Sequence, residues 1–313
     1  MLAIALMFLV LMGTNRLFPP VIPEETLSPD SSVADSGGGV VADDPDGGPV
    51  LPSLPEVLDD APAGAPSEDR PEEGLSERQV IVESPLYRFS FSSYGARLIS
   101  AELPQFQALN REGLVDLIPE GVEGQLSQRL IVGSDTVDLS RVPYTVEPEG
   151  GLSLSGSDEA GTLRFTYQNP TSDFRFTMSY TFNPDTYSVR VSGELSGLPE
   201  RPVLLTDLGE GVAFTEADSA QEARMMAYVH NHLDDGIQST ILDGVEPEIV
   251  QGPLLWAAFR SKFFVTALLA GESEEGTSED LTTDRDYLSA LIVREGSLPE
   301  RVKIETAQSV GND

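Results

Sequence analysis

Apolar and polar residues alternate with a period of two along much of the chain after residue 78, which is typical of half-buried β-strands. Glycine, proline, asparagine or aspartate separates the alternating runs. We therefore expect strands over residues 79–83, 86–92, 97–103, 161–168, 174–182 and 187–195. The pattern predicts an all-β domain of antiparallel sheets, each with one face against a core.

The range 174–182 shows the alternation most clearly. Its large apolar residues fall on one strand face: Phe174, Phe176, Met178, Tyr180 and Phe182. More than 200 residues of such strands, with few helical stretches, favour one large sandwich.

Two local interruptions have their own predictions. Gly95 stands between two paired strands, where it can adopt a positive φ in a turn. A helix is expected over 219–228, with Met225 and Met226 in the core.

The amino terminus has a different pattern. Residues 1–18 are apolar apart from Thr14, Asn15 and Arg16, and Pro19 and Pro20 follow. About 18 residues is near the lower limit for a membrane-spanning helix. The alternative is a cleaved signal peptide, but no small-x-small cleavage site follows, so we favour an uncleaved anchor. No basic residue precedes it, so either the true start lies upstream or another factor sets its orientation.

Residues 19–78 are rich in Pro, Gly, Ser, Asp and Glu and lack strand or helix periodicity. Such a segment cannot bury enough surface to offset its ordering entropy, so we expect a disordered acidic linker. Calcium binding is the alternative, but no EF-hand loop is present. The predicted organisation is an anchor over 1–18, this linker, a β-domain over 79–308 and a tail over 309–313.

Charge and composition exclude some classes of function. The formal net charge of −33 and the lack of a basic run make nucleic acid a poor partner. The absence of cysteine excludes disulfides and thiolate chemistry.

Candidate reactive groups are few. His230 and His232 are the chain's two histidines, and in a strand they would share a face, although their surroundings resemble a loop. Zinc would need a further ligand, and a sugar epimerase would need a positioned carboxylate, so we assign neither a metal site nor a catalytic residue. The glycines of 208–212 are interpreted as a turn.

Residues 256–269 form the most apolar run after the amino terminus. Arg260 and Lys262 interrupt it, and a charge at the bilayer centre costs about 2.5 to 3.5 kcal/mol on insertion scales, so a second span is not expected. Two buried strands, or a strand and a helix, turning at 260–262 fit better, with Trp256 in the core.

Four blocks of the sequence, residues 83–106, 114–119, 174–195 and 256–268, share a pattern with one known family. Together, and in the same order, they resemble the periplasmic domain of the YidC-type membrane protein insertases of Gram-negative bacteria, with 83–106 similar to its first hairpin. The amino-terminal run is similar to the family's first transmembrane helix. The motif positions, interpreted as structural, are Leu86, Phe89, Gly95, Leu98, Leu103, Phe106, Tyr180, Phe182, Tyr187, Trp256, Lys262, Phe263 and Phe264.

The resemblance implies a β-super-sandwich akin to galactose mutarotase, anchored in the inner membrane and facing the periplasm. It implies the Sec translocon, its SecDF complex, nascent membrane proteins and the lipid bilayer as partners, with no cofactor and no enzyme activity. In the family, five further transmembrane helices form a groove with an important arginine. No apolar run after Ala270 approaches membrane length, so we expect a fragment or a split or degenerate copy that does not insert proteins alone.

Two hypotheses follow from these observations. The first is a non-enzymatic periplasmic interaction domain of an insertase. The second is a membrane-tethered carbohydrate-binding or epimerase-like β-sandwich, which would need a cleft holding His230 or His232 beside a carboxylate and aromatic rings.

Overall fold

A computed structural model describes residues 77–156, 158–198, 202–271, 287–298 and 301–309. The predicted anchor and nearly all of the predicted linker lie outside these residues. Within the described ranges, no helix combines the length and hydrophobicity needed to cross a membrane.

The described residues form strands almost throughout, with one short helix, α2 (Ser219–Ala223). The first strands are β1 (Gln79–Glu83), β2 (Arg88–Ser92), β3 (Leu98–Gln107), β4 (Leu114–Asp116), β5 (Gln128–Val132), β6 (Asp135–Asp138), β7 (Thr145–Glu147), β8 (Leu152–Ser153) and β9 (Gly161–Gln168). The others are β10 (Arg175–Phe182), β11 (Val189–Ser196), β12 (Val203–Gly209), β13 (Ala227–His232), β14 (Gly236–Ile241), β15 (Glu248–Arg260), β16 (Val265–Leu269), β17 (Leu288–Glu295) and β18 (Val302–Ser309).

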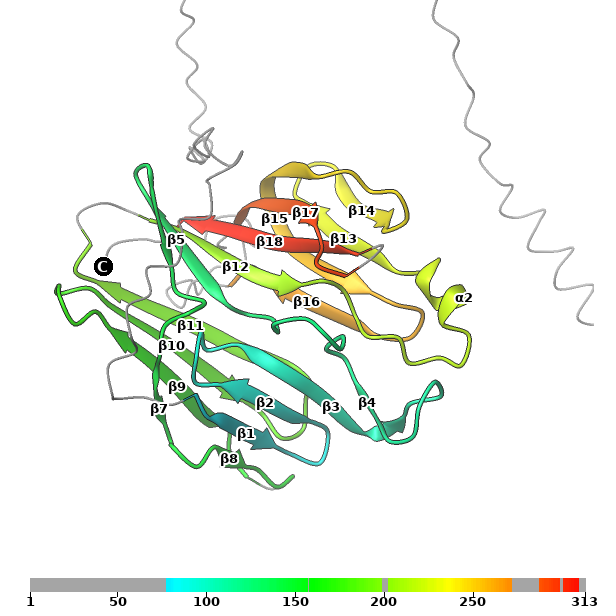
Figure 1. Cartoon of the computed structure of the whole chain (residues 1–313), viewed down its shortest axis with the longest axis horizontal. Coiled ribbons are helices and arrows are strands. Elements are labelled where there is room, and N and C mark those ends of the chain that lie inside the picture. The colour runs from blue at the N-terminus through cyan, green and yellow to red at the C-terminus, as the bar shows by residue number, and fades with distance from the viewer. Residues whose placement is uncertain (1–76, 157, 199–201, 272–286, 299–300, 310–313) are drawn as a thin grey trace, which may run out of the picture. The chain divides into compact units, whose positions relative to one another are not determined.

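These strands make three sheets (Figure 1). A five-stranded sheet has the order β4-β3-β2-β1-β8, and a four-stranded sheet has the order β11-β10-β9-β7. The third sheet has nine strands, in the order β14-β13-β15-β17-β18-β12-β5-β6, with β16 also paired to β15. The pairings are antiparallel apart from the short parallel contact of β1 with β8. The predicted all-β antiparallel architecture is confirmed.

The core between the five- and four-stranded sheets is aromatic. Phe91 of β2 contacts Tyr180 of β10 with ring centroids 5.2 Å apart, and it also packs on Phe165 and Phe182. All four rings are buried, and the same apolar cluster includes residues of the nine-stranded sheet. Aromatic pairs of this kind stabilise a core beyond the area that they bury.

The strand predictions agree closely with the structure. β1 and β9 have the predicted bounds, and β2, β3, β10 and β11 differ from theirs mainly at the ends. The predicted apolar face of residues 174–182 is buried throughout. Gly95 has the predicted positive φ, +77°, and an added Cβ would lie 2.1 Å from the carbonyl oxygen of Ser140.

The helix predicted over 219–228 is correct only in its first half. It ends at Ala223, because the chain from Ala227 pairs with both β14 and β15 as β13. Met226 is buried as predicted, whereas Met225 is exposed.

The apolar run 256–269 forms a hairpin of β15 and β16 that turns at 261–264, close to the predicted position. Its second strand is not buried, because Val265 and Leu269 are more than 60% exposed. The prediction of Trp256 as core is also wrong. The strand alternation turns Ala257 and Phe259 to the core and leaves Trp256 half-buried outside it.

Candidate functional site

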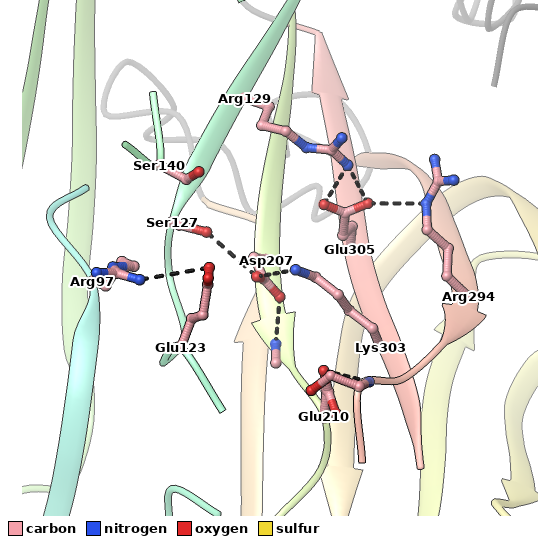
Figure 2. A network of polar contacts seen from close by, with 12 residues as sticks. Arg97, Glu123, Ser127, Arg129, Ser140, Asp207, Glu210, Arg294, Lys303 and Glu305 are labelled. Carbon is pink, nitrogen blue, oxygen red and sulfur yellow. Dashed lines mark hydrogen bonds and ion pairs between the residues drawn. The ribbon is translucent and has the colours of Figure 1, made fainter. Parts of the chain in front are cut away.

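An open hollow of about 270 Å³ with a charged lining lies on the nine-stranded sheet, and Figure 2 shows the network of polar contacts around it. Its rim also receives residues from the loops that precede β5 and follow β6. The charged residues that line it are Arg129, Arg141, Arg294, Lys303, Glu123, Asp138 and Glu305. Four cations in one place are notable in a chain with only 19 Lys and Arg residues, so an anion site is the first interpretation to test.

Glu305 lies at the centre of this charged group. Its side chain is 3% exposed, and the Arg129 guanidinium donates to both of its oxygens. Arg294 adds a third bond, with its Nε 3.3 Å from one carboxylate oxygen. Figure 2 shows the carboxylate between the two guanidinium groups. A buried carboxylate needs such partners, so Arg129 and Arg294 stabilise Glu305 and are not available to an external anion.

Asp207 forms a second centre on the neighbouring strand β12. Lys303 Nζ lies 2.7 Å from its carboxylate, Ser127 Oγ donates to it, and the Gly209 amide donates over 2.7 Å. Burial raises the pKa of Asp207 above its ordinary value, and Lys303 opposes that rise. The ion pair with Lys303 therefore stabilises the charged form of Asp207 at a buried position, where little water is available to solvate it.

The remaining charged contacts at the hollow also lie within the chain. Glu123 forms ion pairs with Arg141 and Arg97, with N–O distances of 3.7 and 3.6 Å. Each of the four lining cations thus has a carboxylate partner: Glu305 for Arg129 and Arg294, Glu123 for Arg141, and Asp207 for Lys303. This balance favours a clamp between the loops and the sheet over a site for an external anion.

The two histidines lie in β13 and not in the loop expected from the sequence. His230 is 3% exposed, and neither ring nitrogen has a hydrogen-bond partner among the described residues. Burial lowers its pKa, Glu248 partly opposes that effect, and His232 adds to it. Within the described part of the chain, no group of three or more metal-binding side chains comes together. Neither histidine lines the hollow, so the sugar-cleft hypothesis gains no support from it.

The family-motif positions separate into two groups in the structure. The first group belongs to the core or packs against it: Leu86, Phe89, Leu98, Leu103, Tyr180 and Phe182. Gly95 belongs with them through its tight turn. These positions explain folding and offer no contact surface.

The second group lies at the surface or near it. Phe106 at the end of β3 packs edge-on against Phe264, with centroids 5.5 Å apart, and Phe264 also touches the core. Lys262 places its Nζ 4.7 Å from the centre of the Phe263 ring, which is 60% exposed. Tyr187 is exposed before β11, far along the chain from the β15–β16 turn.

Sequence reasoning did not identify Glu305, Asp207 or their partners. Their strands lie far apart in the chain, and acidic residues are too frequent here for any one of them to stand out. The available signal was a charged pair, Lys303 and Glu305, at alternate positions of an apolar strand.

A family model and curated relatives match most of this chain. The family model described as the YidC periplasmic domain matches residues 79–310. The membrane protein insertase YidC of Syntrophus aciditrophicus (strain SB) is 26% identical over 299 residues, covering 90% of this chain and 52% of that protein. The YidC of Chlorobaculum parvum is 27% identical over 278 residues, covering 78% of this chain and 45% of that protein. The chain thus spans about half the length of the curated relatives it matches.

Solved structures with some likeness include a galactose mutarotase related enzyme from Lactobacillus acidophilus, with a TM-score of 0.44 and 10% identity over 74% of this chain and 85% of that one. A galactose mutarotase-like protein from Lactobacillus casei has a TM-score of 0.42 and 11% identity over 74% and 87% of the two chains. Likeness at this level carries no information on chemistry. The family match covers most of the chain, and the chain belongs to the YidC periplasmic domain family.

Proposed function

We propose that this chain is the periplasmic part of a membrane protein insertase and assists the insertion and folding of inner-membrane proteins. The observation that carries the proposal is the family match over residues 79–310. The curated relatives named as insertases support it, because one of them aligns with 90% of the chain.

The geometry supports a binding role over a catalytic one. The cations at the hollow are paired with carboxylates, and among the described residues neither ring nitrogen of the buried His230 has a hydrogen-bond partner. What remains available is surface, including the exposed aromatic side chains of Phe106 and Phe263. A domain of this kind acts by contact with other molecules.

The proposed arrangement places residues 1–18 as an anchor in the inner membrane, 19–78 as an acidic linker, 79–308 as the folded domain in the periplasm and 309–313 as a tail. The many like charges of the linker would repel one another and extend it. The domain would then work near the membrane without being fixed against it.

The proposed partners are the Sec translocon, its SecDF complex and nascent membrane proteins. The surface around Phe106, where its ring meets Phe264, is the proposed contact for them. Exposed aromatic side chains in a cluster are typical of such contacts.

Depletion in the source organism tests the function. Cells that lose the native protein containing this domain should accumulate newly made inner-membrane proteins in a protease-accessible form. Unchanged insertion after complete depletion would contradict the proposal.

Affinity purification in mild detergent tests the partners separately. The full chain should retain translocon or SecDF subunits, and Phe106→Ser should retain fewer. Tyr187→Ser is the matched control, since it also removes an exposed ring from a motif position. Equal recovery with all three proteins would contradict the proposed contact.

A further inference from the structure

Four neighbouring strand segments of the nine-stranded sheet carry no acidic residue. They are residues 227–232, 236–241, 254–260 and 265–269, in β13, β14, β15 and β16. The whole chain has 52 Asp and Glu residues, so four neighbouring segments without a carboxylate are unusual within it. Figure 1 shows these strands together at one end of the sheet.

The strand register shows which of their side chains share a face, because directly paired residues point to the same side. We call this surface the outer face. Its three rows, across β14, β13, β15 and β16, are Ile241-Ala227-Arg260-Val265, Ser239-Val229-Ala258-Ala267 and Ile237-Asn231-Trp256-Leu269.

The outer face is open along its edges, whereas Ala227, Val229 and Ala258 in its middle are at most 8% exposed and lie outside the main core. The intervening residues Tyr228, Ala257 and Phe259 belong to the main apolar cluster, on the opposite side of the sheet. Ile237 and Leu269 on the outer face are 68% and 66% exposed, at its two edges. Large apolar side chains exposed together along the edges of a sheet face are typical of a site of contact with a partner or a membrane.

Charge at one end of the outer face indicates the chemistry of the partner. Arg260 lies in its first row, where its Nη1 and Nη2 donate to the Met225 carbonyl and to Ser239. Lys262 follows in the turn, near Glu216. At the opposite end, Asp234 and Asp235 occupy the β13–β14 turn. The partners of Arg260 named above are neutral and Lys262 is paired with Glu216, so one positive charge remains at this end, whereas the opposite end is acidic.

The aromatic residues on and beside the outer face favour a lipid surface as its partner. Trp256 lies on the face, and Phe263 lies in the turn beside Arg260. Apolar strands bordered by Trp, Phe, Lys and Arg have the composition that proteins present to the boundary between lipid headgroups and acyl chains. The remainder of a chain with a net charge of −33 would be repelled by an anionic leaflet.

We propose that the outer face binds the surface of a phospholipid bilayer, with Arg260 and Lys262 toward the lipid phosphates and the end bearing Asp234 and Asp235 tilted away. The inference rests on the proposed function for one element only, the anchor over 1–18 that brings the domain near the membrane. It adds a second, reversible membrane contact through the folded domain.

Trp256 provides a direct test, because it is the only tryptophan in the chain. The full chain is reconstituted into vesicles of phosphatidylethanolamine and phosphatidylglycerol, with or without brominated phosphatidylcholine. Bromine quenches tryptophan at short range, so Trp256 emission should fall at least twofold in the brominated vesicles. Flotation of the same samples measures the anchor, so failure of anchoring and failure of this contact are distinguished.

Variants locate the contact. Ile237→Asp with Leu269→Asp places charge on two exposed positions and should abolish the quenching while flotation persists. Tyr187→Asp is the matched control, on an exposed position outside the outer face, and should remain quenched. Arg260→Glu should weaken the quenching, and it provides a second reading if the double variant does not fold.

Two results would overturn the proposal. One is floating vesicles in which Trp256 is equally bright with both lipids. The other is absence of lipid quenching together with a blue shift of Trp256 when an apolar transmembrane peptide is added, which would assign the outer face to a protein partner.

Discussion

Two apolar regions of this domain have the same strand alternation and opposite surroundings. Phe176, Tyr180 and Phe182 of β10 are buried against β2, whereas Ile237, Val265 and Leu269 of the outer face are open. Alternation in a sequence shows that a strand has an apolar face. Whether that face becomes core or contact surface depends on whether another layer of the fold covers it.

The largest expected effect is on stability and separates these two regions. Phe182→Ala removes a ring that packs on Tyr87, Phe89 and Phe91, and should lower the free energy of unfolding by about 3–5 kcal/mol. Ile237→Ala should change it by less than about 0.5 kcal/mol, because the side chain is already in water. Urea denaturation of both variants measures the difference, and similar losses would contradict the assignment of the outer face as surface.

Two Glu→Gln variants compare a buried with an exposed position at the hollow. Glu305→Gln leaves Arg129 and Arg294 without their buried carboxylate and should cost about 2–3 kcal/mol. Glu123→Gln is the control, because that side chain is 70% exposed and its ion pairs should contribute about 0–1 kcal/mol. A neutral result for Glu305→Gln in chemical denaturation would show that the clamp does not stabilise the domain.

The turn at Gly95 gives a smaller effect. Gly95→Ala combines a positive φ with a Cβ that would lie 2.1 Å from the Ser140 carbonyl oxygen, and should cost at least about 2 kcal/mol. Gly113→Ala has a positive φ without any atom nearby and should cost only about 1 kcal/mol. Thermal unfolding measures the loss of stability in both variants. Equal losses would show that the chain moves to avoid the contact between the added Cβ and Ser140.

The smallest effect concerns His230 on the buried side of β13. Burial lowers its pKa in the folded chain, so the unfolded chain binds the proton more readily. Stability present above the unfolded pKa, about 6.5, is therefore lost as pH falls below it. Unfolding measured at pH 8 and pH 5 should show a smaller acid loss for His230→Leu than for the natural chain. His232→Gln should retain most of the loss, and an unchanged loss in His230→Leu would contradict the assignment.

Local sequence patterns were enough to predict the elements whose conformation depends mainly on their own residues. The apolar period of residues 174–182 and the glycine at position 95 required no knowledge of distant neighbours. The helix ended early because pairing of β13 with β14 and β15 outweighed local helix preference. Trp256 was assigned to the core because the sequence does not show which face of β15 meets the other layer.

The hollow could not be predicted for a related reason. Arg129, Asp207 and Glu305 come from β5, β12 and β18, and only the order of these strands in the sheet brings them together. The outer face has the same origin, because its rows join residues from four strands. Sheet order and register are long-range properties, and the alternation of a single strand does not contain them.

The most direct test of the central claim, that the outer face is a membrane contact, is photo-crosslinking in living cells. A benzophenone amino acid replaces Leu269 in the native protein containing this domain, and in a second strain it replaces Tyr187 as the control. After irradiation, mass spectrometry of the purified protein identifies what is attached at each position. We predict phospholipid adducts at position 269 and few at position 187. Adducts at position 269 that consist of protein alone, or equal lipid adducts at both positions, would contradict the claim.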